Sequence, residues 1–241
     1  MHLSAIPVLL AVCASLFGVT GPDTFHWSGR VAQGQLLEIR SVNGSIHAAP
    51  ALDDTVDVIA YRTGTDREAL TGVQVFEHLG GGVTIAVPPS ENSAAANNVD
   101  FDVRVPRGVR FVARTVNGRV EAQSLEADTE VHTVNGDVLV STDHAAQGET
   151  VNGTIDATVG RIDGASRFST VNGGITLAMP ACVRARVHAT TQNGAIRSEF
   201  PLAVRGVSPA RHAEGHIGRG GPELIVDTVN GTIHLKQKKG V

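Results

Sequence analysis

Two histidines, His212 and His216, stand four residues apart in the sequence, with Glu214 between them. On a helix, histidines at this spacing could ligate one zinc ion. Pro209 and Gly215 argue against a helix in this segment. The acid is also not placed as in the H-E-x-x-H motif of zinc proteases. We therefore predict a surface loop here, and no metal site in the chain.

Two acids, Glu149 and Asp156, are close enough in the sequence to suggest the carboxylate pair of a glycoside hydrolase. Both belong to a repeat that is described below. At the position of Asp156 the other copies hold residues of mixed chemistry, namely His47, Glu121, Leu139, Thr176, Arg197 and His234. Catalysis needs a few groups held in one geometry, whereas such a mixture is typical of a solvated face. We predict no catalytic residue and no bound cofactor.

The repeat is marked by seven Asn-Gly steps, each followed by one variable residue and then by Ile or Val. The steps are Asn43-Gly44, Asn117-Gly118, Asn135-Gly136, Asn152-Gly153, Asn172-Gly173, Asn193-Gly194 and Asn230-Gly231. From Asn117 to Asn193 they are 17 to 21 residues apart, and the outer intervals of 74 and 37 residues are close to four and two such units. Residues 79–85 resemble a worn copy at the midpoint of the longer interval. The sequence thus predicts units of about 18–20 residues running almost from end to end.

Strands are expected on both sides of each step, because apolar and polar residues alternate there. Phe111 and Ala113 precede one step, and Val120 and Ala122 follow it. A period of two predicts a strand with one buried face. Residues 99–105 show the same alternation, which Pro106 ends. One short helical turn is predicted by the capping-box pattern of residues 65–68.

Two all-β architectures compete. Asn-Gly between alternating apolar residues is a strong hairpin signal, because a type I′ turn needs positive φ twice. A hairpin, however, leaves the Val before Asn, present in six of seven copies, on the polar face without a reason to recur. In a single-stranded β-solenoid, Val stacks on Val and the Asn amides form a ladder, while Gly takes a left-handed conformation at each corner. The solenoid is therefore favoured, with the Thr that opens six copies in a structural role.

The chain resembles the bacterial putative-adhesin family, exported proteins long classed as a domain of unknown function. The resemblance lies in the run of V-N-G-x-[IV] motifs, in the strand ending at Pro106 and in the closing segment 218–233, and it covers about residues 30 to 237. It implies a β-helix-like domain, and it brings no catalytic residues to carry over.

Composition and the termini bear on location. Lys+Arg 20 nearly balances Asp+Glu 24, which argues against a nucleic-acid binder. The apolar stretch from Leu3 to Val19 reads as a secretory leader over residues 1–20, followed by N-terminal rungs and a cap over 21–110 and the repeat-bearing solenoid over 111–241. Cys13 could serve as a lipoprotein attachment site, and Cys182 is expected to be a small buried residue. The three terminal lysines, Lys236, Lys238 and Lys239, are expected to protect an edge strand.

These features predict an exported, non-catalytic surface, adhesion or scaffold module of the bacterial envelope, in the periplasm, at the cell surface or outside the cell. Its expected partner is a surface polysaccharide or an envelope protein, with no nucleic acid and no membrane span after leader removal. A polysaccharide-active β-helix enzyme and an envelope-sensing component with a protein partner are the alternatives.

Overall fold

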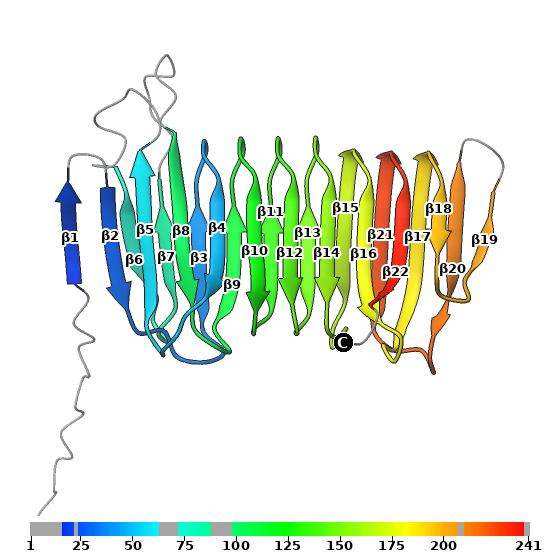
Figure 1. Ribbon diagram of the computed structural model, residues 1–241, viewed down its shortest axis with the longest axis horizontal. Coiled ribbons are helices and arrows are strands. Elements are labelled where there is room, and N and C mark those ends of the chain that lie inside the picture. The colour runs from blue at the N-terminus through cyan, green and yellow to red at the C-terminus, as the bar shows by residue number, and fades with distance from the viewer. Residues whose placement is uncertain (1–15, 22–23, 63–71, 88–97, 207–209, 239–241) are drawn as a thin grey trace, which may run out of the picture.

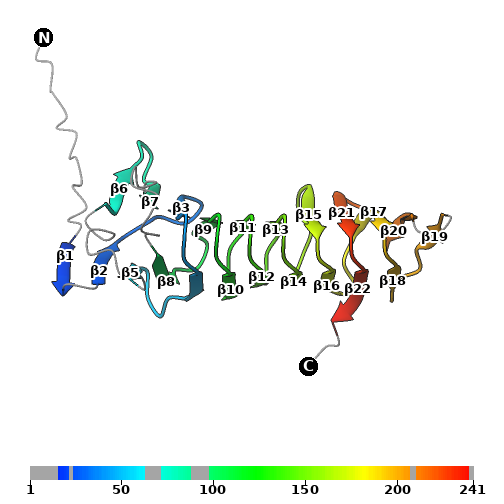
Figure 2. The same ribbon diagram turned by 90° about the horizontal axis from the view of Figure 1, so that it is seen from above.

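The computed structural model describes residues 16–21, 24–62, 72–87, 98–206 and 210–238. The first fifteen residues of the expected leader and the capping-box pattern of residues 65–68 lie outside this part of the chain. Within it the protein is all-β, as predicted, with two eleven-stranded sheets. The sheets lie face to face along a long stack, and the chain crosses repeatedly from one to the other (Figures 1 and 2).

The first sheet is parallel through its middle. Its order is β1 (Leu16–Gly21), β2 (Thr24–Gly29), β5 (Val56–Arg62), β8 (Val99–Val105), β4 (Ile46–Pro50), β10 (Val120–Leu125), β12 (Val138–Thr142), β14 (Ile155–Val159), β16 (Ile175–Pro180), β22 (Ile233–Lys238) and β18 (Ile196–Ser198). Equivalent residues of successive copies are in register, so that Val120 pairs with Val138, Val138 with Ile155 and Ile155 with Ile175.

The second sheet repeats this arrangement on the other side of the core. Its order is β19 (Ala203–Arg205), β20 (Arg211–Ile217), β17 (Ala185–Asn193), β21 (Glu223–Asn230), β15 (Ser166–Asn172), β13 (Ala146–Glu149), β11 (Thr129–His132), β9 (Arg110–Arg114), β3 (Leu36–Arg40), β7 (Val83–Ala86) and β6 (Gln74–Glu77). Each middle strand continues into a partner in the first sheet, β9 into β10 and β11 into β12, which is the arrangement of a β-solenoid.

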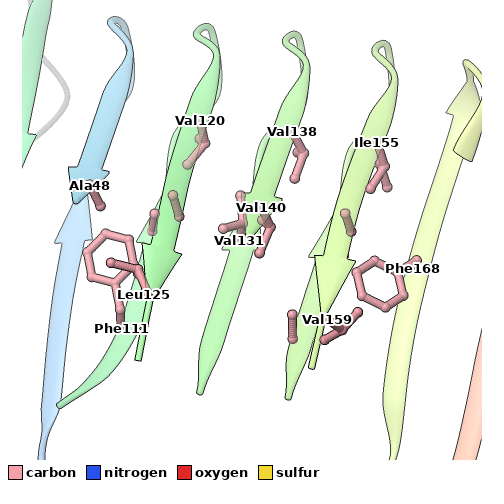
Figure 3. Packing of buried hydrophobic residues seen from close by; sticks show 14 of the residues in the cluster. Ala48, Phe111, Val120, Leu125, Val131, Val138, Val140, Ile155, Val159 and Phe168 are labelled. Atoms are coloured by element: carbon pink, nitrogen blue, oxygen red, sulfur yellow. The ribbon is translucent and has the colours of Figure 1, made fainter. Parts of the chain in front are cut away.

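The core fills the space between the sheets. Inward residues alternate with outward ones along each strand, as in β14, where Ile155, Ala157 and Val159 are buried. Figure 3 shows Ile155 and Val159, with labelled side chains of the neighbouring strands, pointing into one continuous interior. The large ring of Phe168 lies beside Gly148, whose missing side chain leaves room for it; a Cβ there would stand 3.3 Å from the ring. Large and small residues on neighbouring strands therefore compensate one another.

The rungs do not follow one another in chain order, contrary to the simple winding that the spacing predicts. Strand β21 lies between β15 and β17, and strand β22 lies between β16 and β18. The last copy of the repeat therefore stacks inside the array (Figure 1). At the other end β4 pairs directly with β10, although 74 residues separate Asn43 from Asn117. The worn copy also lies elsewhere than predicted: β7 pairs with the outer side of β3, away from β9.

Antiparallel strands cover both ends of the stack. Strands β2 and β5 cover β8, β6 covers β7, and β20 and β19 cover β17. The terminal lysines do not mark an end of the stack, because β22 lies between β16 and β18. Lys236 and Lys238 lie on its last part, which pairs with β16 and extends past the end of β18, and Lys239 lies outside the described residues. Cys182 is exposed instead of buried, in the connection that follows β16.

Candidate functional site

The seven Asn-Gly steps form one corner of the stack, which we call the Asn-Gly corner. From Asn117 onward in the spatial order, each Asn side chain donates from Nδ2 to Oδ1 of the preceding Asn at 2.8 Å. In spatial order the residues are Asn43, Asn117, Asn135, Asn152, Asn172, Asn230 and Asn193. Asn230 thus bridges Asn172 and Asn193, which confirms that the last copy is inserted.

The backbone at this corner is bonded to neighbouring rungs and forms no hairpin. The amide of Asn117 donates to the Val42 carbonyl at 2.8 Å, and the amide of Gly118 donates to the Asn135 carbonyl at 3.0 Å. The strands before and after the step, β9 and β10, belong to different sheets. The hairpin meander is therefore wrong.

The corner glycines are needed for a different reason from the predicted left-handed backbone. Of the seven, Gly44 alone has a positive φ. At Gly153, a Cβ would stand 2.0 Å from the carbonyl oxygen of Gly136, and at Gly173 it would stand 1.9 Å from that of Gly153. The rungs approach so closely here that a side chain has no room.

The threonines that open the copies fix the same corner from inside. The hydroxyl of Thr150 donates to the Gly136 carbonyl at 3.0 Å, and that of Thr170 donates to the Gly153 carbonyl at 2.9 Å. The same bond recurs at Thr115, Thr133, Thr191 and Thr228. All six threonines are buried. Their structural role is thus as predicted.

The valines at this corner point the other way. Val116, Val134, Val151 and Val171 are 37–38 % exposed, and we call them the valine row. Each of these valines directly precedes an Asn of the ladder. Hydrogen bonds join their backbones: the amide of each valine donates to the carbonyl oxygen of the valine in the preceding rung, from Val134 to Val116, from Val151 to Val134 and from Val171 to Val151. Core packing does not explain their recurrence. The corner therefore presents one apolar side chain and one amide per rung to the surface.

Charged residues gather on the outer face of the second sheet. Arg114 contacts Glu38 at 3.1 Å and Glu130 at 2.7 Å. His132 contacts the same Glu130 at 2.7 Å and Glu149 at 3.2 Å. We call these five residues the carboxylate network. It joins strands β3, β9, β11 and β13.

Two carboxylates of this network are held in the ionised form. Burial alone would raise the pKa of Glu38, but hydrogen bonds from Arg40 and Arg114 outweigh it and lower that pKa. Burial opposes ionisation of Glu130 in the same way, and its pKa is lowered by the bond from His132 and the charge of Arg114. A general acid needs a raised pKa. These two carboxylates are therefore suited to holding strands together.

From the sequence, Glu149 was considered only as one half of a carboxylate pair with Asp156, and the residues that stack with it were not identified. The outward positions of neighbouring copies carry Arg40, Arg114, His132 and Glu149, in register across β3, β9, β11 and β13. Opposite signs at stacked positions were the available signal. Without the chain order of the rungs, the sequence could not show which copies are neighbours.

The suggested pair Glu149 and Asp156 is not brought together. Glu149 ends β13 in the second sheet, where it contacts His132, whereas Asp156 lies on β14 in the first sheet. Both positions are outward in their sheets, so the two carboxylates face opposite sides of the molecule. They cannot act on one glycosidic bond.

The histidine-rich segment forms a strand, and the predicted loop is wrong. His212, Glu214 and His216 lie on the outer face of β20, which pairs antiparallel with β17. Glu214 contacts His212 at 2.8 Å and His188 at 3.4 Å. The described residues contain no group of three or more His, Cys, Asp or Glu placed to hold a metal ion. No helix in them is long and apolar enough to cross a membrane.

Several solved structures are similar to this chain in fold. A putative cell adhesion protein from Clostridium sporogenes matches with a TM-score of 0.49 and 11 % identity, over 88 % of this chain and 99 % of its own. A putative adhesin from Bacteroides fragilis matches with a TM-score of 0.36 and 12 % identity, over 90 % of this chain and 98 % of its own. No family model and no curated protein matches the sequence. The likeness agrees with the expected resemblance, and it concerns the fold alone.

Proposed function

We propose that this protein is an exported, non-catalytic module of the bacterial envelope that binds a linear surface polymer along its stack. The observation that carries this proposal is the valine row beside the Asn ladder. Rungs of a β-stack are about 4.8 Å apart, so a polymer lying along the corner meets the same apolar group and amide at each of the four rungs of the valine row. Stacked rungs provide long, stiff binding surfaces of this kind.

The ligand class follows from the chemistry of the corner. The valine methyl groups can cover the apolar face of a sugar ring, while the Asn side chains keep unused carbonyl lone pairs for hydroxyl groups. Stacking on aromatic rings plays no part at this corner, because none of the seven repeat copies has a Phe, Tyr or Trp beside its Asn-Gly step. A neutral or weakly charged polysaccharide fits this surface, and an adhesion or scaffold role follows from holding it.

Export is supported by the apolar stretch from Leu3 to Val19. We expect the mature protein in the envelope or the medium without this leader, which N-terminal sequencing would show. Recovery of intact Met1 on a cytoplasmic protein would contradict export.

The binding test uses the mature protein and insoluble envelope polysaccharides, with retention and release of soluble sugars measured together. We expect retention without product release, and a loss of retention when Val134 and Val151 are both changed to Ser. Val204→Ser is a matched control, because this valine is also exposed but lies on β19, away from the corner. Equal retention of the double variant and wild type would overturn the proposal.

One observation favours the enzyme alternative. Burial raises the pKa of Asp227 despite the nearby charge of Arg167, as a general acid requires. If the protein releases sugars and Asp227→Asn abolishes the release while retention persists, the molecule is an enzyme that uses this acid. We expect no release from either protein.

A further inference from the structure

A pocket of about 310 Å³ lies on the outer face of the second sheet, at the end where β17, β20 and β19 lie side by side (Figure 1). It is lined by the side chains of Arg186, His188, Arg205, His212, Glu214 and His216. Its volume is at the small end of the range for ligand pockets, about 300–1,000 Å³. It therefore has the size for a single small residue of a larger ligand.

Strand register explains why these residues meet. Arg186 pairs with His216, and His188 pairs with Glu214 across β17 and β20. Arg205 pairs with His212 across β20 and β19. Because alternate residues of a strand share a face, these side chains all point outward from the sheet. The antiparallel end of the stack thus holds five cationic or titratable basic groups on one surface.

The acid in the pocket is already occupied. Glu214 is contacted by both His212 and His188, and the bond from His212 lowers its pKa. In the described part of the chain, the guanidinium groups of Arg186 and Arg205 have no hydrogen bond or ion pair. Two arginines are therefore available beside a carboxylate that already has two histidine partners.

Two further acids lie on the neighbouring strand β21, and each has a basic group near it. Glu223 on β21 pairs with Arg186 on β17, and its carboxylate approaches His188 to 3.8 Å. Asp227 lies further along β21, where Arg167 contacts it at 3.3 Å. The acids around the pocket are thus each near a basic partner, and the arginines remain for a ligand.

We propose that this end pocket binds the carboxylate of an acidic sugar, a uronate residue within a surface polysaccharide. The planar guanidinium fork matches a carboxylate in a bidentate manner, and the histidines add donors. The saccharide part of this assignment rests on the proposed function, whereas the anion part rests on the pocket itself.

The experiment is calorimetric titration of the full protein with trigalacturonate at pH 7. We expect at least tenfold weaker binding when Arg186 and Arg205 are both changed to Gln. Arg219→Gln is the matched control, because this exposed arginine lies at the same end but outside the pocket. Thermal melts of all variants show whether each one is folded.

Two further ligands separate the possible outcomes. Neutral galactotriose should not bind the pocket, and galactose 6-phosphate should bind more weakly than the uronate. Tighter binding of the phosphate, or binding unaffected by the double substitution, would overturn the uronate assignment. Retention on neutral polysaccharide through the valine row is measured separately, so failure of the pocket and failure of the proposed function are distinguishable.

Discussion

At the Asn-Gly corner, the carbonyl oxygen of each glycine lies where the β-carbon of the next rung's residue would have to be. The sequence identifies glycine at these positions but suggests the wrong cause. A dihedral requirement can be inferred from an Asn-Gly dipeptide, whereas a contact between residues 17 apart, such as Gly136 and Gly153, becomes visible only once the rungs are stacked.

Gly153→Ala should therefore destabilise the protein by about 2–3 kcal/mol, because the added methyl group meets fixed backbone and the rungs must separate. The measurement is the free energy of unfolding in denaturant. Gly164→Ala is the control, because nothing lies within 4 Å of its added Cβ. Equal melts for the two variants would contradict the close-approach explanation.

Asn152 tests the ladder. Its side chain donates to Asn135 and accepts from Asn172, so Asn152→Ala removes two hydrogen bonds. Each hydrogen bond contributes about 1 kcal/mol net, and less where the amide is exposed to water. We therefore expect the free energy of unfolding to fall by about 1–2 kcal/mol. Asn152→Asp keeps the acceptor but sets a carboxylate against the Asn135 oxygen. The Asp variant should therefore lose more unfolding free energy at pH 7, where the carboxylate is ionised, than at pH 3. A loss that does not depend on pH would argue against the ladder geometry.

At the level of the strand, the alternation of apolar residues was enough to predict which side chains fill the core. Phe111, Ala113, Val120 and Ala122 were expected inside, and each is buried. The order of the strands was not predictable, because every copy carries the same pattern and any copy can stack on any other. For this reason the sequence did not show that the strand of Lys236 lies inside the stack.

The carboxylate network couples strand pairing to pH. Because the folded-state pKa of both Glu38 and Glu130 is lowered, each contributes stability that is present above its unfolded pKa, about 4.5, and is lost as the pH falls through the folded value. Glu38 matters most, since its side chain is only 6 % exposed.

We expect Glu38→Gln to lower the free energy of unfolding at pH 7 by about 1.5–3 kcal/mol, as for hydrogen bonds to charged groups. The variant should also show a weaker loss of stability between pH 5 and pH 3 than wild type. Denaturant melts across this range measure both effects. The exposed Asp54→Asn serves as the control, and a wild-type pH profile in Glu38→Gln would show that the network does not stabilise the fold.

For the molecule as a whole, the inserted last rung decides how the stack holds together. The middle rungs were predicted from spacing alone, but the sequence could not show that Asn230 lies between Asn172 and Asn193. Strands β17 and β18 are therefore joined to the rest of the array through β21 and β22, which come later in the chain. The stack is complete only after its final strands have been placed.

A chain that ends at Pro222 tests this arrangement, because it lacks β21 and β22 and leaves β17 and β18 without their inner neighbours. We expect protease to cleave residues 185–206 in this shortened chain and to spare them in the full protein, since their apolar faces lose the rung that covers them. A chain ending at Ala181 keeps the rungs from β3 to β16 and should melt at a temperature no lower than the chain ending at Pro222. A sequential solenoid would behave in the opposite way, with the longer chain more stable because it loses one terminal rung. Protection of residues 185–206 in the chain that ends at Pro222 would therefore contradict the inserted rung.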